Sequence, residues 1–434
     1  MVSNIFDHIS FKTIYFSQIF DANDVDMNFY LMKLPLYSSQ NFVHPSKLTR
    51  LTTCLTQLNR NLYHERNIPK TLDEFKQFQF KPNEQPENAR SLRVAIIGCP
   101  NAGKSTLLNQ LINWKISAVS SKVHTTRKNV IGIYVENNTQ LEFIDTPGLV
   151  SRKHMMRHKL ELSFANDLKI SAGNADIIAM LVDISNRRER SKLNQGILDL
   201  LQQYHNDENK ESLLVLNKVD KIRDKRSLLD IVSTLTNGIV DGHPVSSSNI
   251  DDDILKAELK QGKFDMLFQR TDKYYKEYQD KNIETVESDF KHNGIGWPKF
   301  SQVFMISALH NDGIQQLRKY FLQKAKEKSW FYSGNVVTVQ NPKQIIIDTI
   351  REVCLELFNQ EIPYNFRYQI VMWEQDDLGN LYLVVDILCP EKFLSLLIGP
   401  KGLNISNIVR KARESLSNIF HCDISLKIAA KSFR

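Results

Sequence analysis

The chain has 434 residues, 42% of them hydrophobic and 24% charged, with a formal net charge of +7 at pH 7. This length allows two or three domains, and this composition excludes a largely disordered chain. Five widely separated cysteines without a CxxC pair argue against a disulfide framework or zinc site, and no apolar run approaches the roughly 20 residues that span a bilayer.

Residues 1–90 are expected to form an N-terminal extension rather than a domain. Residues 28–64 contain no Asp or Glu but many basic and hydroxyl side chains, a composition typical of mitochondrial transit peptides. A start at Met27 or Met32 would bring this stretch to the terminus. Residues 65–90 are interpreted as a polar linker. The sequence therefore predicts a mitochondrial protein, and the alternative is a merely polar extension.

From residue 91 onward, short apolar runs alternate with stretches of helical character. The runs predicted as buried strands are residues 92–97, 141–144, 177–182, 213–216 and 303–306, and a helix is predicted over 106–112. This alternation predicts an α/β domain over residues 91–333, with a mainly parallel sheet and helices on both faces. A polar insertion of unknown role is expected within about 221–300.

The first of these strands leads into a predicted phosphate-binding loop. Residues 98–105, GCPNAGKS, fit G-x-x-x-x-G-K-[ST] in full, between a strand and a helix. Backbone N–H groups would surround the phosphates, Lys104 would reach the β- and γ-phosphates, and Ser105 would coordinate Mg²⁺. The nucleotide contacts predicted in this segment are Gly98, Asn101, Ala102, Gly103, Lys104, Ser105 and Thr106.

Two later segments also follow apolar strands. In residues 145–148, DTPG, Asp145 would hold Mg²⁺ through water and the Gly148 N–H would meet the γ-phosphate. In residues 217–220, NKVD, the carboxylate of Asp220 could accept hydrogen bonds from guanine N1–H and the exocyclic amine, a pair of donors that adenine lacks. Lys218 could lie over the base and Asn217 could tie the loops together. Backbone N–H groups after the last strand could meet guanine O6, at Ser307, Ala308 and Leu309. The predicted cofactors are therefore GTP or GDP and Mg²⁺.

Taken together, these elements resemble the translation-factor-related class of GTPases, and within it the Era family. Residues 123–127, VHTTR, resemble that family's switch I segment, where a threonine would complete the Mg²⁺ shell. Thr126 is favoured for this position, and Thr125 stays open. No general base can be named from the sequence. The residues expected to act in hydrolysis are Lys104, Thr126 and Gly148.

Slow hydrolysis is a second implication of the resemblance. Ras-like enzymes place a glutamine after the switch II glycine to orient the attacking water, and this chain has Leu149 there. In related potassium-dependent GTPases, an asparagine at the position of Asn101 helps to bind K⁺. That role for Asn101 stays open beside a purely loop-stabilising one.

A second, α+β unit is predicted over residues 334–434. An amphipathic helix over 342–358, strands near 368–373 and 381–388, two helices around a GxxG loop, and a last strand near 424–428 match a type II KH domain. Residues 398–434 contain seven Lys or Arg and two acidic residues, so the GxxG side is the basic one. A helix-connecting turn beside a solvated basic face is the alternative. The predicted RNA contacts are Gly399, Pro400, Lys401, Gly402, Arg410 and Lys411.

The Era resemblance covers roughly residues 92–434, with Pro400 departing from the family's usual small or basic residue. It implies a monomeric GTPase that binds small-subunit ribosomal RNA near its 3′ end and helps the pre-ribosomal small subunit to mature. The expected location is the mitochondrial matrix, with a peripheral contact to the inner membrane left open. One rival is an RNA chaperone that the nucleotide only stabilises. Another is a tRNA-modification GTPase, which carries a terminal cysteine motif and lacks a KH domain.

Overall fold

The computed structural model of the chain describes residues 66–80, 85–119, 129–148, 163–205, 207, 210–245, 295–359 and 362–433. Several predictions fall outside these residues. They concern the transit segment over 28–64, the switch I threonines Thr125 and Thr126, and Leu149. Among the helices that the structure describes, none has the length and apolarity needed to cross a membrane.

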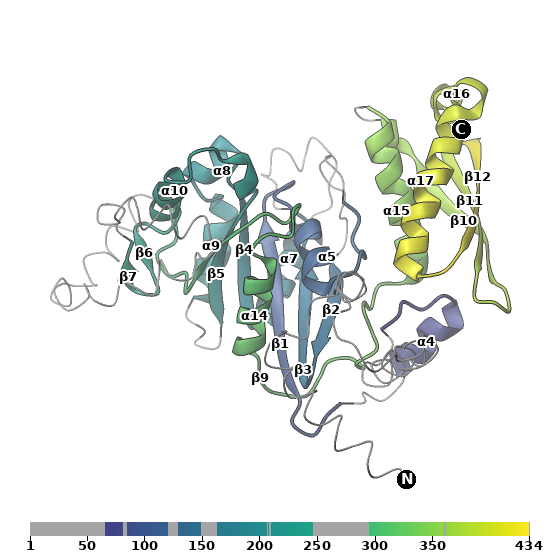
Figure 1. Ribbon diagram of the computed structural model, residues 1–434. Coiled ribbons are helices and arrows are strands. Elements are labelled where there is room, and N and C mark those ends of the chain that lie inside the picture. The colour runs from purple at the N-terminus through teal and green to yellow at the C-terminus, as the bar shows by residue number, and fades with distance from the viewer. Residues whose placement is uncertain are drawn as a thin grey trace, which may run out of the picture. The chain divides into compact units, whose positions relative to one another are not determined.

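The apolar runs of the first half of the chain pair into a seven-stranded sheet (Figure 1). Its order is β2-β3-β1-β4-β5-β8, and β9 pairs with β1. The strands are β1 (Arg90–Gly98), β2 (Val130–Glu136), β3 (Thr139–Asp145), β4 (Ile177–Asp183), β5 (Glu211–Asn217), β8 (Val303–Ile306) and β9 (Lys326–Glu327). All pairings are parallel except β2 with β3 and β9 with β1, so the predicted mainly parallel α/β fold is confirmed.

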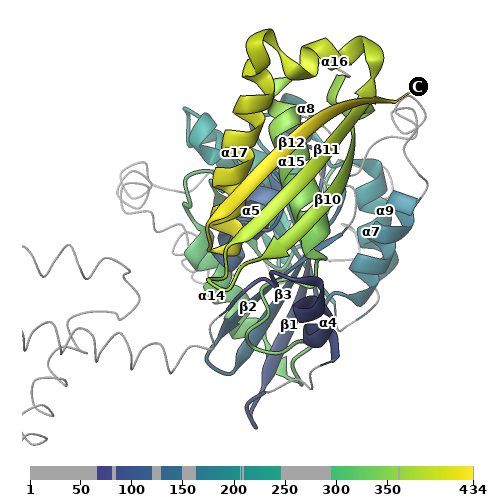
Figure 2. The ribbon, with the colours of Figure 1, turned by 90° about the vertical axis from the view of Figure 1, so that its right-hand side faces the viewer.

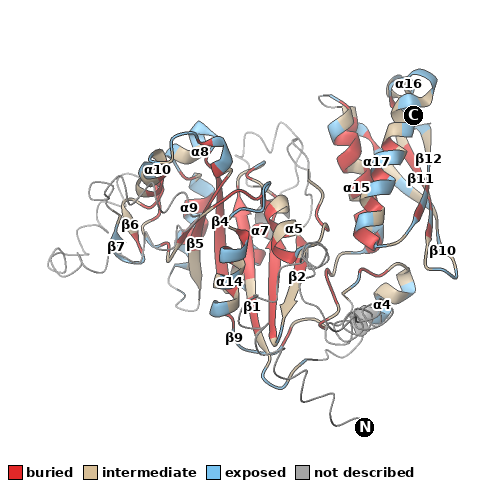
Figure 3. Cartoon of the chain, in the orientation of Figure 1, coloured by how far each residue is buried: buried red, intermediate tan, exposed pale blue. Residues whose placement is uncertain are grey.

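Helices cover both faces of this sheet, because successive side chains of a strand point to opposite faces. Val94 and Ile96 of β1 belong to one buried cluster with side chains of α5 and α14, whereas Ala95 and Ile97 belong to another with side chains of α7, α9 and α10. Figure 2 shows α5 and α14 on one side of the sheet and α7 and α9 on the other. The buried strands between them are fully covered (Figure 3). The helices are α5 (Lys104–Ile112), α7 (Ser163–Asn174), α8 (Arg187–Ser191), α9 (Gln195–Tyr204), α10 (Ser227–Leu235) and α14 (Ile314–Lys324).

The C-terminal module has the element order expected of a type II KH domain. It contains α15 (Pro342–Leu357), β10 (Arg367–Gln375), β11 (Leu381–Pro390), α16 (Glu391–Ile398), α17 (Leu403–Phe420) and β12 (Ile424–Phe433). Strand β11 pairs antiparallel with β10 and parallel with β12, and α15 and α17 pack behind the sheet (Figure 2). The buried cluster of this module is continuous with the α5–α14 side of the α/β domain.

Parts of residues 221–300, within which a polar insertion is expected, belong to packed structure. Short antiparallel strands β6 (Ile239–Val240) and β7 (His243–Pro244) follow α10, and the apolar side chains of α10 are buried. Trp297 and Phe300 join the same buried cluster. Residues 221–245 and 295–300 therefore belong to the packed domain, and residues 246–294 lie outside the described part.

The segment predicted as a polar linker is also partly structured. It contains helix α4 (Leu72–Phe80), and before it Ile68 is 2% exposed. Arg66 donates hydrogen bonds to the carbonyl oxygens of Ile112 (3.3 Å) and Ile133 (2.6 Å). Its guanidinium lies 5.6 Å from the ring centre of Tyr134, and burial lowers the Arg66 pKa to about 10. A buried polar side chain thus fixes this segment to the α/β domain.

Replacing Arg66 tests this attachment. Arg66→Met keeps much of the side-chain length but leaves two carbonyl groups without their donor, so we expect a loss of about 2 kcal/mol in the free energy of unfolding. Lys76→Met, on exposed α4, is the matched control and should change stability by no more than about 0.5 kcal/mol. Denaturant unfolding measures both, and equal effects of the two substitutions would contradict the attachment.

Candidate functional site

The loop between β1 and α5 brings backbone unusually close to its neighbours. A Cβ at Gly98 would lie 2.4 Å from the carbonyl oxygen of Leu181, and one at Gly103 would lie 2.3 Å from Asn217 Nδ2. Gly103 also has φ +99°, which L side chains rarely adopt. Both glycines of the predicted phosphate loop are therefore required by the packing around them.

Lys104 folds back over this loop. Its ammonium donates hydrogen bonds to the carbonyl oxygens of Cys99 (2.9 Å) and Gly98 (3.2 Å), and the residue is 6% exposed. Burial lowers the pKa of Lys104, and the nearby charge of Asp145 opposes that shift. A buried ammonium held by carbonyl oxygens at this loop is suited to exchange them for phosphate oxygens. Thr106 lies two residues further along, within the first turn of α5.

Asp145, at the end of β3, is fully buried beside this lysine. Its Oδ2 accepts hydrogen bonds from Ser105 (2.6 Å) and Ser117 (3.0 Å). Its Oδ1 is buried and has no hydrogen-bond partner among the residues that the structure describes. Burial raises the pKa of Asp145, and the Lys104 charge opposes that shift. A carboxylate oxygen in need of a partner, next to a serine hydroxyl, fits a hard cation such as Mg²⁺.

The start of the predicted switch II loop lies against the phosphate loop. The Thr146 hydroxyl donates to the carbonyl oxygen of Ile96 (2.8 Å). A Cβ at Gly148 would lie 2.7 Å from Pro100 N, so only glycine allows this approach. The structure thus brings Gly148 together with Lys104, Ser105 and Asp145 at one edge of the sheet. Asn101 is exposed at the tip of the loop with φ +62°.

Asn217 connects the phosphate loop to the loop after β8. Its Nδ2 donates to the carbonyl oxygen of Ala102 (2.8 Å), and its Oδ1 accepts from the Ala308 N–H (3.0 Å). Lys218 has φ +67°, and its ammonium bridges the Asn101 carbonyl oxygen (2.8 Å) and the Asp183 carboxylate (2.5 Å). These side chains fix the two walls of the predicted base site.

Asp220 faces the same loop from the other side. Its Oδ1 accepts a hydrogen bond from the Ser307 hydroxyl (2.6 Å), while its Oδ2 lies 3.9 Å from His310 Nε2. Ser307 and Ala308 are buried, whereas Leu309 is 70% exposed. The predicted base-reading residues therefore converge at the carboxyl ends of β5 and β8, where open α/β sheets bind ligands.

Three residues near the site are not predicted by the sequence motifs. Ser117 bonds to Asp145 but belongs to no motif. Asp183 and His310 contact the NKVD loop only because separate strands end at the same edge. The end of an apolar strand was a usable signal for Asp183, since the other site carboxylates also follow strands. No local signal identifies Ser117 or His310.

The GxxG loop exposes its backbone between α16 and α17. A Cβ at Gly399 would lie 2.6 Å from the Asn404 side chain, whose Nδ2 donates to the carbonyl oxygen of Leu396 (2.8 Å). Gly402 has φ +77° and a nearly open Cβ position. Pro400 begins a single 3-10 turn. The basic side chains predicted to contact RNA are exposed, namely Lys401, Arg410 and Lys411.

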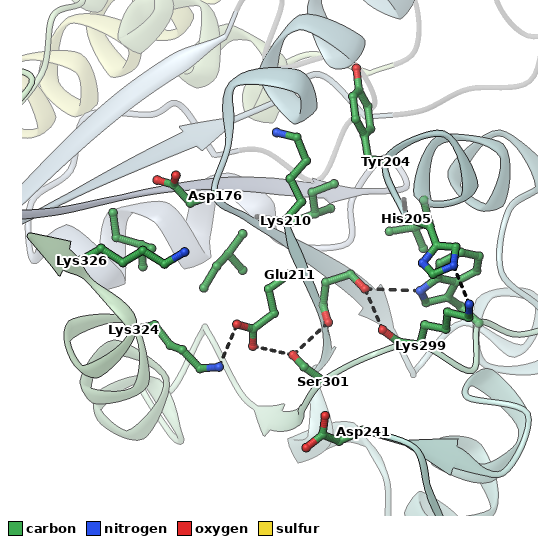
Figure 4. A pocket seen from close by; sticks show the side chains of 16 residues that line it. Asp176, Tyr204, His205, Lys210, Glu211, Asp241, Lys299, Ser301, Lys324 and Lys326 are labelled. Atoms are coloured by element: carbon green, nitrogen blue, oxygen red, sulfur yellow. Dashed lines mark hydrogen bonds and ion pairs between the residues drawn. The ribbon is translucent and has the colours of Figure 1, made fainter. Parts of the chain in front are cut away.

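A cavity of about 500 Å³ lies at the opposite edge of the sheet, where β4 and β5 begin (Figure 4). Several of its charged groups form ion pairs or hydrogen bonds with other residues of the protein. Lys324 pairs with Glu211 (2.8 Å), and Lys210 donates to carbonyl groups at the end of α7. Glu211 also accepts a hydrogen bond from Ser301 (2.5 Å). The cavity is separate from the residues of the predicted nucleotide site.

The chain is similar in sequence to known GTPases. A family model described as 50S ribosome-binding GTPase matches residues 93–218. The mitochondrial GTPase Era of Danio rerio is 38% identical over 352 residues, covering 81% of this chain and 77% of the relative. The mitochondrial GTPase Era of Caenorhabditis elegans is 28% identical over 347 residues, covering 76% of this chain and 87% of the relative.

Two solved structures share the fold. A crystal structure of Era in complex with MgGDPNP and nucleotides 1506–1542 of 16S ribosomal RNA matches with a TM-score of 0.56 and 23% identity, over 80% of this chain and 94% of that chain. A variant of Aquifex aeolicus Era bound to GDP and AlF₄⁻ matches with a TM-score of 0.56 and 24% identity, over 79% and 94%. Because the sequence identity to the Danio rerio protein extends over most of both chains, this chain belongs to the Era family of GTPases.

Proposed function

We propose that this GTPase is a switch that binds small-subunit ribosomal RNA through its KH module and assists maturation of the mitochondrial small ribosomal subunit. The observation that carries the proposal is the presence, in one chain, of buried Lys104 and Asp145 beside a glycine loop and of an exposed basic GxxG loop. The relative crystallised with MgGDPNP and a 16S ribosomal RNA fragment supports the pairing of these two ligands.

At the nucleotide site, Lys104 would exchange its carbonyl partners for the β- and γ-phosphates. Ser105 and Asp145 would hold Mg²⁺, with Thr126 of switch I as the proposed third protein group. The ion, when bound, neutralises charge on the phosphate oxygens. The Gly148 N–H would donate to the γ-phosphate, and its close packing on Pro100 supports that role. Asn101 as a K⁺ ligand remains part of the proposal for hydrolysis.

At the base site, Asp220 would read guanine. Ser307 already donates to one carboxylate oxygen, which fixes the rotation of the side chain. The acceptors that remain suit two adjacent donors, as guanine N1–H and its amine present them. Adenine would leave the carboxylate without those partners, and an unsatisfied polar group is costly.

At the KH module, the glycine loop would let RNA backbone approach closely. Lys401, Arg410 and Lys411 would neutralise phosphates, so RNA affinity should fall as salt rises. Exposed apolar side chains flank the same loop and could contact bases, namely Leu396, Ile398 and Leu403. Together these features support about four nucleotides of single-stranded RNA as the ligand.

The location and partners follow from the same proposal. Relatives named as mitochondrial GTPase Era support a mitochondrial location. Within the organelle we propose the matrix, where the pre-ribosomal small subunit would be the partner of a monomeric protein. A peripheral contact with the inner membrane is an open extension of this proposal.

Asp220→Asn tests the reading of the base. The substitution replaces a carboxylate, whose two oxygens both accept hydrogen bonds, with an amide that also donates one. GTP affinity should therefore fall by about 100-fold or more. Xanthosine triphosphate carries a carbonyl at C2 that can accept from the amide, so it should bind better. Asp224→Asn, four residues along on an exposed turn, is the matched control. Binding titrations with both nucleotides measure the change. Unchanged GTP affinity in Asp220→Asn would exclude this role.

Asp145→Asn tests the buried charge. Burial raises the pKa of Asp145, so its stabilising contribution is complete below the unfolded-state pKa and is lost as pH rises through the raised folded-state pKa. Without nucleotide, the variant should therefore lose less stability than wild type as the pH rises above about 4, the pKa of Asp in an unfolded chain. Adding Mg²⁺ and GTP should also stabilise the variant less than it stabilises wild type. Thermal melts measure both effects, and a variant stabilised by Mg²⁺ like wild type would contradict the assignment.

Two substitutions at Gly402 test RNA binding and its target. Gly402→Asp would set a carboxylate beside the RNA backbone, whereas Gly402→Asn has nearly the same shape without charge and tolerates positive φ. We expect crosslinking in cells to the 3′ end of mitochondrial small-subunit rRNA to fall by about tenfold or more in the Asp variant, and much less in the Asn variant. Crosslinks to other RNAs, or equal signals from both variants, would remove the ribosomal role and leave the GTPase.

A further inference from the structure

Helix α5 has the phosphate loop at one end and the KH module at the other. Residues 113–119 follow the helix, and Trp114 in this segment donates a hydrogen bond from Nε1 to the carbonyl oxygen of Ile419 near the end of α17 (2.9 Å). The same indole stacks on His421, with ring centres 4.0 Å apart and planes inclined by 25°. On the domain side, the Arg66 guanidinium lies 6.0 Å from the indole centre. Trp114 is thus held by both parts of the chain.

Lys115 adds a charged contact beside this ring. Its ammonium pairs with Glu352 of α15 (3.1 Å) and donates a hydrogen bond to the Ser415 hydroxyl of α17 (2.8 Å). The Glu352 side chain is 10% exposed, and burial raises its pKa while Lys115 opposes that shift. A partly buried ion pair depends strongly on the position of both partners, so Lys115 fixes α15 and α17 relative to α5.

Two residues further on, the same segment reaches the proposed Mg²⁺ ligand. Ser117 donates its hydroxyl to Asp145 Oδ2, the oxygen that also accepts from Ser105. Asn109 of α5 clamps the turn, because its Oδ1 accepts from the Ile116 and Ser117 N–H groups (both 3.0 Å) and its Nδ2 donates to the Ser117 carbonyl oxygen (2.9 Å). A displacement of Ser117 would therefore move the whole turn rather than bend a flexible chain.

Helix α17 leads from this contact to the GxxG loop. It begins at Leu403, directly after Gly402, and its eighteen residues end at Phe420, beside the Trp114 contact. A helix of this length spans about 27 Å as one stiff element. Asp145 and the GxxG loop are thus joined by a continuous series of contacts through Ser117, Lys115 and Trp114.

We propose that residues 113–119 couple the nucleotide site to the RNA-binding loop, with Trp114 and Lys115 as the coupling residues. The inference rests on the proposed function of a GTPase switch that binds RNA, and it adds that RNA affinity depends on the bound nucleotide. A change in the bonding of Asp145 between the GDP and GTP states shifts Ser117. The clamped turn then carries that shift to the end of α17 and so to the GxxG loop.

The test is the ratio of RNA affinities in two nucleotide states. Binding of an RNA from the 3′ end of small-subunit rRNA to the full chain is measured with Mg²⁺·GDP and with a non-hydrolysable GTP analogue. Trp114→Phe keeps an aromatic ring but removes the hydrogen bond from the indole N–H to the carbonyl oxygen of Ile419. The matched control is Trp373→Phe in β10, since Trp373 Nε1 is buried without a hydrogen-bond partner among the described residues. A second variant, Lys115→Met with Glu352→Met, removes both charges of the pair and so avoids burying one alone.

In wild type, a ratio of about 5 to 150 is the usual range for coupled sites, and RNA should change the affinity for the GTP analogue, relative to that for GDP, by the same factor. In both coupling variants these two ratios should lie within about twofold of one. Their nucleotide affinity without RNA should stay near that of wild type. The Trp373→Phe control should keep the wild-type ratios. Wild-type ratios in either coupling variant would overturn the inference. RNA binding without any nucleotide dependence in wild type would overturn it too, but leave RNA binding standing. Absence of RNA binding would instead defeat the proposed function.

Discussion

The buried carboxylate of Asp145 is the constraint on which the arrangement of the site depends. A charge without solvent is unfavourable unless partners surround it, and here an ammonium and two hydroxyl groups offset only part of that cost. These partners come from the start of α5 and from the turn after it. Strand β3, helix α5 and the turn are therefore held together by one carboxylate. Its Oδ1 has no hydrogen-bond partner among the residues that the structure describes, and such an oxygen suits a cation.

Much of this organisation could be predicted from the sequence because its signals are local. Buried strands of a parallel sheet are continuous apolar runs, and the nucleotide loops directly follow such runs. The predicted strands differ from the observed ones mainly at their ends. In β12, for example, small and polar residues continue the pairing to Phe433 beyond the apolar segment. The GxxG loop was also recognisable, because its two glycines lie between two helical stretches of the sequence. In the structure both glycines have a positive φ.

The remaining features depend on contacts between distant residues, which leave no local pattern. Strand β2, VIGIYVE, is itself a mostly apolar run that the prediction omits, but its place at the edge of the sheet and its antiparallel pairing with β3 cannot be read from that run. Arg66 lies in a polar stretch, and its structural role depends on hydrogen bonds to carbonyl groups 46 and 67 positions away in the sequence. Helix α10 is short and flanked by polar segments, which hid its buried face. The switch I threonines lie outside the described residues and stay predictions.

The buried apolar cluster that runs from the α5 side of the sheet into the KH module has a consequence for folding. It includes Ile112 and Ile116 on one side and Val337, Ile345 and Ile346 on the other. Because the two modules share this cluster, they should melt as a single cooperative unit. During synthesis, the α/β domain would keep part of its apolar surface uncovered until the last hundred residues emerge, a state prone to aggregation and suited to chaperone binding.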